Sequence, residues 1–130
     1  LDKNRIDKKI KYGFSSNYES YNDLSETKNL LLNNEINLDQ INLFDVEKTI
    51  NIKAKIDLVI SLKSMGYHYP LENYLNLFKK HCSQDAIFIF DISKGYYDGI
   101  LLTKIFKKVE LIYEENSIHP LNRVCCKGLT

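Results

Sequence analysis

The 130-residue sequence is poor in the features that mark membrane, nucleic-acid-binding and disulfide-rich proteins. It contains three cysteines, two prolines, five glycines and no tryptophan. No apolar run approaches the roughly 20 residues that a membrane-spanning helix needs. Its 18 basic side chains nearly balance its 17 acidic ones, so no overall field draws in nucleic acid. We therefore expect neither a nucleic-acid partner nor a membrane partner.

The cysteines also lack the spacing of a metal or redox site. Cys82, Cys125 and Cys126 form no CxxC pair and no cluster with histidine that would bind zinc. Adjacent cysteines in a strand point to opposite faces and do not readily bridge each other. The sequence predicts no metal site, and we expect the three thiols to be small buried hydrophobes in a reducing cytoplasm.

The sequence motifs of several large enzyme classes are absent as well. The chain has no GxGxxG, no P-loop lysine, no HExxH and no Ser-His-Asp ordering. Each motif supplies a specific chemistry, such as phosphate binding or nucleophile activation. Common hydrolase and NTPase functions therefore lack support.

Hydrophobic periodicity predicts one α/β domain. Hydrophobic residues make up 44% and charged residues 27% of the chain, which is ordinary for a globular domain with a core. Short apolar runs predict strands, and apolar positions spaced three or four apart predict helices. The predicted strands are residues 41–45, 56–61, 86–92, 109–113 and 123–127, and the predicted helices are residues 17–34, 71–82 and 99–107.

The order of these elements predicts a doubly wound fold. A strand, a helix and a further buried strand imply a parallel crossover. The turn at His119 and Pro120 is short enough to join the last two strands as an antiparallel hairpin. We therefore expect a mostly parallel sheet with helices on both faces and an antiparallel C-terminal hairpin.

Candidate site residues follow the ends of the predicted strands. In open α/β sheets, ligands bind beyond the carboxyl ends of the strands. Asp45, the loop 61–70 and Asp91 occupy such positions. An aspartate at a strand end also serves solubility or helix capping, so this alternative stays open for Asp45 and Asp91.

The loop 61–70 is the most unusual stretch of the chain. His68 lies between Tyr67 and Tyr69, Gly66 permits a sharp turn, and Pro70 suits the first turn of a helix. A histidine with a near-neutral pKa can take a proton from a hydroxyl group. A hydrogen-bonded loop histidine with no catalytic role is the alternative.

Three segments together carry a resemblance to a known family. They are Tyr12-Gly13-Phe14 before a helix, the segment IDLVISLKSMGYHYP at residues 56–70, and the strand 87–91. With them the chain resembles the later two-thirds of class I S-adenosylmethionine-dependent methyltransferases, which have a Rossmann-like fold. The likeness is strongest to sugar O-methyltransferases. It implies S-adenosylmethionine as cofactor and a small hydroxyl compound, such as a sugar, as methyl acceptor.

The resemblance also assigns roles to individual residues. Asp2 matches the acidic residue that holds the ribose of the cofactor. Asp45, with Val46 beside it, matches the position that contacts the adenine. Ser61 and Leu62 match the segment that faces the methyl donor. On the acceptor side the resemblance places Lys63, Tyr67 and Tyr69 as substrate-binding residues and His68 as the catalytic base, although Lys63 also suits a solvated surface position.

Two departures from the family refine this expectation. Residues 1–130 contain no counterpart of the family's first strand, glycine-rich loop and first helix, so we expect a single partial methyltransferase domain. The Ser-Leu-Lys segment at 61–63 differs from the Asp/Asn-Pro-Pro-aromatic signature of nitrogen methyltransferases, which favours an oxygen acceptor.

A non-catalytic domain that serves protein association is the alternative function, whereas a response-regulator-like fold is disfavoured by the terminal hairpin.

The missing first strand leads to one structural expectation. In the complete fold that strand lies beside the strand 56–61. The strand 56–61 should therefore either pair with residues 41–45 or be left with an open edge.

Overall fold

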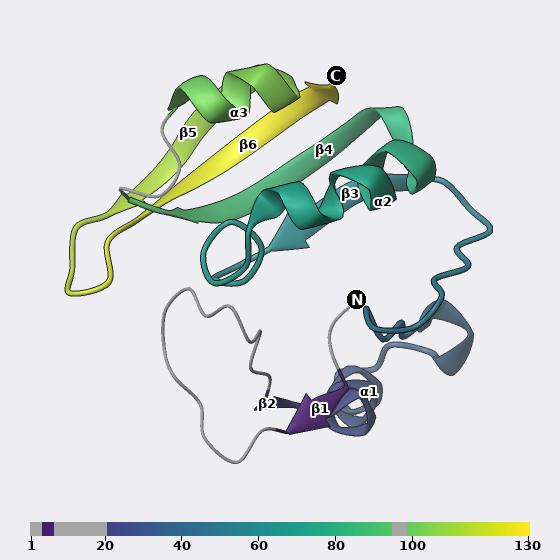
Figure 1. Cartoon of the computed structure of the whole chain (residues 1–130). Coiled ribbons are helices and arrows are strands. Elements are labelled where there is room, and N and C mark those ends of the chain that lie inside the picture. Colours follow the sequence, from purple (N-terminus) through teal and green to yellow (C-terminus); the bar gives the residue numbers. More distant parts are fainter. Residues whose placement is uncertain (1–3, 7–20, 95–98) are drawn as a thin grey trace. The chain divides into compact units, whose positions relative to one another are not determined.

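The computed structural model describes residues 4–6, 21–94 and 99–130, which belong to two compact units (Figure 1). The first unit extends to Asn51 and the second begins at Ile52. In the first unit, the short strands β1 (Arg5–Ile6) and β2 (Tyr21–Asn22) pair antiparallel, and helix α1 (Leu24–Asn33) and the 3-10 helix η1 (Leu38–Gln40) follow.

Helix α1 begins where an aspartate can cap it. The Ser25 backbone N–H donates to Asp23 Oδ1 at 2.7 Å, which satisfies one of the free donors of the first turn. The hydrogen bonds from Ser25 hold the pKa of Asp23 below its usual value. The helix ends at Asn33, and Asn34 follows as its C-cap. The predicted end is thus confirmed, but the predicted start near residue 17 is wrong, since residues 21–22 form a strand.

The predicted strand at residues 41–45 is also wrong. After η1 the chain has no strand until β3. The alternation of apolar and polar residues is present here, and Leu43 and Phe44 are half-buried. A strand also needs a neighbour for its backbone N–H and C=O groups, and none of the described strands pairs with this segment.

The second unit is built on a four-stranded mixed sheet. Its strands are β3 (Ile56–Ser61), β4 (Cys82–Ser93), β5 (Phe106–Glu115) and β6 (Leu121–Leu129), in the order β3-β4-β6-β5. Strand β3 runs parallel to β4, whereas β6 is antiparallel to both β4 and β5. The α/β class and the terminal antiparallel hairpin are confirmed. The predicted mostly parallel sheet is confirmed in part: β3, β4 and β5 run in one direction, but β6 runs in the opposite direction between β4 and β5, so the sheet is mixed.

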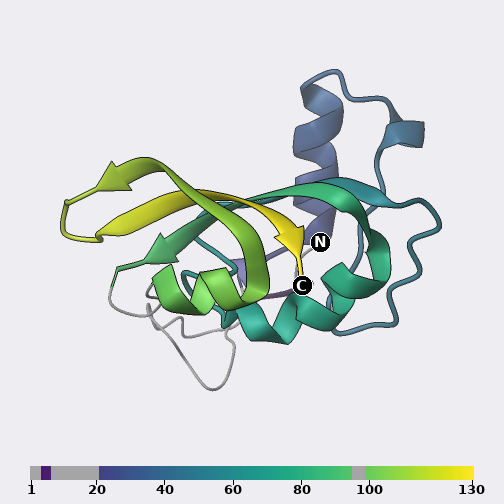
Figure 2. The same ribbon diagram turned by 90° about the horizontal axis from the view of Figure 1, so that it is seen from above.

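The helices of this unit lie on one face of the sheet (Figures 1 and 2). The 3-10 helix η2 (Leu71–Tyr74) continues into α2 (Leu75–His81), and α3 (Gly99–Ile105) connects β4 to β5. We expected helices on both faces of the sheet, which is wrong for this unit. The connection from β3 to β4 and the connection from β4 to β5 both move in the same direction across the sheet. Because crossovers between strands that run in the same direction share one hand, their helices lie on the same face. None of the described helices is long and apolar enough to cross a membrane.

The core lies between these helices and the sheet, and it is rich in phenylalanine. The ring of Phe88 lies 5.3 Å from that of Phe78 and 5.0 Å from that of Phe106. Alternate residues of β4 point into this core, as the two-residue period of a strand requires. Cys82 and Cys126 are buried here, as expected, while the neighbouring Cys125 is only half-buried. The buried cluster consists of Leu71, Phe78, Cys82, Ala86, Phe88, Phe90, Ile92, Leu102, Ile105, Phe106, Val124 and Cys126.

Candidate functional site

The loop after β3 is closed by its own backbone. The Ser61 hydroxyl, which is buried, accepts a hydrogen bond from the Met65 backbone N–H at 2.8 Å. The Ser64 carbonyl oxygen accepts the N–H groups of Tyr67, His68 and Tyr69 at 3.0, 2.8 and 3.1 Å. A carbonyl that accepts three successive N–H groups closes a compact turn. This turn fixes the backbone that carries the rings of Tyr67, His68 and Tyr69.

Gly66 fixes this loop against the end of β4. Its φ of +84° favours glycine, and an added Cβ would lie 2.5 Å from Ile92 Cδ1. The Gly66 N–H donates to the Tyr69 carbonyl at 2.7 Å, and the Gly66 carbonyl accepts the Ser93 N–H at 3.3 Å. The predicted sharp turn at Gly66 is therefore present, and no larger residue fits there without displacement of Ile92.

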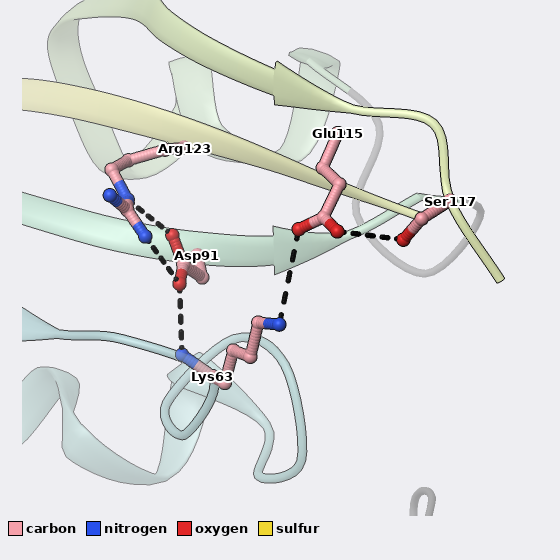
Figure 3. A network of polar contacts seen from close by, with 5 residues as sticks. All are labelled: Lys63, Asp91, Glu115, Ser117 and Arg123. Atoms are coloured by element: carbon pink, nitrogen blue, oxygen red, sulfur yellow. Dashed lines mark hydrogen bonds and ion pairs between the residues drawn. The ribbon is translucent and has the colours of Figure 1, made fainter. Parts of the chain in front are cut away.

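A buried carboxylate anchors the beginning of the loop (Figure 3). Asp91, on β4, is fully buried, and its Oδ2 accepts the backbone N–H of Lys63 at 3.1 Å. Arg123, on β6, donates from Nε to Asp91 Oδ1 at 2.7 Å and from Nη2 to Asp91 Oδ2 at 3.1 Å. Lys63 has a φ of +51°, which costs energy for a residue with a side chain. The bond to Asp91 stabilises that conformation.

Arg123 compensates the charge of Asp91 while it keeps contact with solvent. Its side chain is 32% exposed, and its guanidinium carbon lies 5.6 Å from the centre of the Tyr113 ring. The hydrogen bond to Asp91 is the main cause that raises the pKa of Arg123 above its usual value. A two-pronged bond of this kind fixes the orientation of the carboxylate as well as its charge.

The same end of the sheet carries a second group of ionic contacts, from the end of β5 and the turn that follows it. Lys63 Nζ lies 3.9 Å from Glu115 Oε2, and the Ser117 hydroxyl donates to Glu115 Oε1 at 2.7 Å (Figure 3). Lys94, just after β4, forms an ion pair with Glu114. These contacts link the loop after β3 to the β5–β6 turn, although exposed ion pairs of this kind contribute little stability.

His68 has the protonation properties of a base. It is half-buried, and burial is the larger of the two causes that lower its pKa; the second is the nearby charge of His119. The Tyr67 ring meets the imidazole edge-on, with 4.8 Å between ring centres. Both causes lower the pKa of His68, and this favours the neutral imidazole that a general base needs.

Six of the predicted site residues are neighbours in the sequence and belong to the last position of β3 and the loop that follows it. Ser61, Leu62, Lys63, Tyr67, His68 and Tyr69 all lie between the end of β3 and the start of η2.

The remaining predicted residues lie elsewhere. Asp45 and Val46 belong to the first unit, where Asp45 Oδ1 accepts the Glu47 N–H at 3.0 Å and Oδ2 lies 3.6 Å from Lys48 Nζ. Asp2 lies outside the described residues. Since residues 41–45 form no strand, Asp45 does not follow a strand as predicted.

Arg123 and Glu115 are the site residues that sequence reasoning missed. Arg123 stands 32 residues after Asp91, and the two become neighbours only through the antiparallel register of β4 and β6. An alignment of the predicted hairpin with the strand 86–92 would have placed an arginine opposite an aspartate, which is a favourable cross-strand pair.

Among the described residues, no group of three histidine, cysteine, aspartate or glutamate side chains is arranged to hold a metal ion. Comparison of the chain with protein-family models, with curated proteins and with solved structures found no significant match.

Proposed function

We propose that this chain is the later part of an S-adenosylmethionine-dependent O-methyltransferase that acts on a hydroxyl group of a sugar or another small molecule. One observation carries the proposal. A half-buried histidine with a lowered pKa, His68, lies in an anchored loop at the carboxyl end of the parallel pair β3–β4, where α/β sheets bind their ligands.

The sheet supports this proposal independently of the loop. The final strand β6 runs antiparallel between β4 and β5, and the two connecting helices α2 and α3 cover one face. This arrangement agrees with the last four strands of the class I methyltransferase fold that the sequence resembles. A fold of this kind hosts many activities, so the residues of the loop have to carry the functional argument.

The residues of the loop fit an S-adenosylmethionine site in part. Leu62 is 50% exposed next to the end of β3 and offers an apolar contact to the cofactor. The Ser61 hydroxyl accepts the Met65 N–H, which leaves it one hydrogen to donate. The nucleoside-binding roles of Asp2, Asp45 and Val46 stay predictions from the resemblance, since Asp2 lies outside the described residues and Asp45 and Val46 belong to the first unit. When bound, S-adenosylmethionine supplies an electrophilic methyl group.

The acceptor side of the loop provides the base and the binding groups. In the proposed reaction His68 would take the proton of the acceptor hydroxyl, whose oxygen would then receive the methyl group that bound S-adenosylmethionine would supply. Tyr67, Tyr69 and Lys63 position the acceptor. The Asp91 carboxylate holds the backbone of Lys63, and this keeps the loop preorganised for transfer.

Methyl transfer from labelled S-adenosylmethionine to a panel of sugars tests the proposal. His68→Gln should lower kcat by about 10²–10⁴-fold, the usual contribution of a general base, and leave KM unchanged. His119→Gln is the comparison variant: His119 is exposed and its charge lowers the pKa of His68, so this variant should retain kcat within a few-fold and shift only the pH dependence of kcat. Equal kcat values for His68→Gln and the unchanged protein would exclude His68 as the base.

A second candidate function is protein association without catalysis. Among the described residues β3 pairs only with β4, and this favours it, because an exposed strand edge is a template for pairing with another chain. Either function is compatible with a cytoplasmic location, which we propose because the three cysteines are free thiols.

A further inference from the structure

The cations of the second unit have different surroundings at the two ends of the sheet. At the end that carries the candidate site loop, three cations each pair with a carboxylate. The pairs are Lys63 with Glu115, Lys94 with Glu114, and Arg123 with Asp91. The positive charge of these three side chains is therefore balanced within the unit itself.

The opposite end, where β4 and β5 begin and β6 ends, carries six exposed lysines (Figure 1). We call this surface the basic end. Its lysines are Lys79 and Lys80 in the last turn of α2, Lys104 in the last turn of α3, Lys107 and Lys108 on β5, and Lys127 on β6. Within the part of the chain that the structure describes, Lys108 alone of the six forms an ion pair, with Glu110 at 3.5 Å.

The helix ends account for only some of these lysines. A cation in the last turn of a helix is favourable beside the partial negative charge of the free carbonyls, and Lys79, Lys80 and Lys104 occupy such positions. Other groups already bond two of these carbonyls. Lys55 Nζ donates to the Lys80 carbonyl at 3.0 Å, and the Thr130 hydroxyl donates to the Lys104 carbonyl at 2.9 Å.

The lysines on the strands have no such explanation. Lys108 lies directly opposite Lys127 in the antiparallel pair β5–β6, and like charges directly opposite each other destabilise a sheet. Glu110 offsets the charge of Lys108, but Lys127 has no carboxylate partner among the described residues. Departures from a local rule of this kind are expected at functional surfaces.

The side chain of Lys107 is held in place before any partner binds. Gly128 lies beside it on β6 with a φ of +67°, and an added Cβ at Gly128 would lie 3.1 Å from Lys107 Cβ and 3.1 Å from Lys107 Cδ. The aliphatic part of Lys107 therefore packs over the Gly128 backbone, with the ammonium group left at the surface. A lysine that is already ordered loses less entropy when it binds an anion.

The composition of the basic end favours a protein partner over a nucleic acid. Asp85 and Glu110 are exposed among its lysines, and these carboxylates would repel a phosphate backbone. Single-stranded nucleic acid also needs aromatic rings on which its bases stack. The aromatic side chain among the described exposed apolar residues is Tyr113, which lies opposite Arg123 on the other half of β5.

We propose that the basic end binds an acidic segment of a partner protein, whose aspartate and glutamate carboxylates pair with Lys104, Lys107 and Lys127. Complementary charge of this kind selects the partner and its orientation. The surface lies at the end of the sheet opposite the candidate site loop, so a partner here leaves the loop accessible. This proposal does not depend on the proposed methyltransferase function.

An NMR titration with a peptide of about ten glutamates at low salt tests this proposal. We expect saturable shifts of the backbone amides of Lys104, Lys107 and Lys127. The double variant Lys107→Gln, Lys127→Gln should raise the dissociation constant about 3–10-fold, as expected for the loss of two exposed ion pairs. The matched control is Lys28→Gln with Lys48→Gln, which removes the same charge from the first unit and should leave the dissociation constant unchanged.

Several results would overturn the proposal. One is the absence of shifts at the basic end with up to about 1 mM peptide, from a chain that circular dichroism shows to be folded. Another is an equal loss of affinity in the two double variants, which would mean that only the net charge matters. A third is tighter binding of a single-stranded oligonucleotide with the same number of charges, which would make the partner a nucleic acid.

Discussion

Replacement of Asp91 by alanine tests how the site loop is held. Asp91 is fully buried and accepts three hydrogen bonds, from the Lys63 backbone N–H and from two nitrogens of Arg123. A hydrogen bond to a charged acceptor contributes about 1.5–3 kcal/mol. In Asp91→Ala the Lys63 N–H loses that acceptor, while the partly exposed guanidinium of Arg123 finds water instead.

We therefore expect Asp91→Ala to lower the free energy of unfolding by about 2–3 kcal/mol, with most of the loss from the Lys63 bond. Urea denaturation measures this change. The matched control is Asp85→Ala, an exposed carboxylate on the same strand β4, which should change stability by less than about 0.5 kcal/mol.

Hydrogen exchange resolves whether the loop itself is affected. The Lys63 amide should be protected in the unchanged protein and should exchange faster in Asp91→Ala, whereas amides of the core strand β4 should lose protection only to the extent of the global destabilisation. An equal loss of stability in the Asp91 and Asp85 variants, or unchanged protection of the Lys63 amide, would refute the anchoring role of Asp91.

Four further predictions concern the site loop and the core. His119→Gln removes a positive neighbour and should raise the pKa of His68, which an NMR titration of the imidazole protons measures; no change would show that His119 does not act on His68. The folded pKa of His68 lies below its unfolded value near 6.5. Between these two pH values the unfolded state binds more protons than the folded state. Stability should thus fall as the pH drops below about 6.5 and level off below the folded pKa, a dependence that His68→Gln should remove. Gly66→Ala should destabilise the protein by about 1–3 kcal/mol, since its Cβ would meet Ile92 at a positive φ, and a value near zero in urea denaturation would contradict the close approach. Burial raises the pKa of Cys126 to about 12, so a thiol reagent should modify Cys125 first under native conditions, and mass spectrometry of the labelled chain checks the order.

Local patterns in the sequence were sufficient to predict most of the second unit. The apolar runs at β3 and β4 and the helical stripe at 71–82 predict elements that the structure contains, because burial and periodicity act within a few residues. The end of α1 at Asn33 was predicted for the same reason. Its start was not, because the capping role of Asp23 had to be chosen from several polar residues that precede the helix.

Long-range pairing was the part that the sequence could not supply. Residues 41–45 have the alternation of a strand, but strand formation depends on a neighbour that the local pattern does not encode. The position of β6 between β4 and β5 likewise depends on register, and only this register brings Arg123 to Asp91. The candidate loop 61–70 and Asp91 were selected from the sequence, whereas Arg123 and Glu115, which contact them, were not.

An NMR titration of S-adenosylmethionine into the isotopically labelled chain tests the central claim most directly, that the loop after β3 is a methyl-donor site. The account predicts saturable shifts of the backbone amides of Ser61, Leu62 and Lys63, with a change in the imidazole signals of His68. S-adenosylhomocysteine should shift the same signals. The absence of any shift in this loop with either compound at up to about 1 mM ligand, from a folded chain, would contradict the claim.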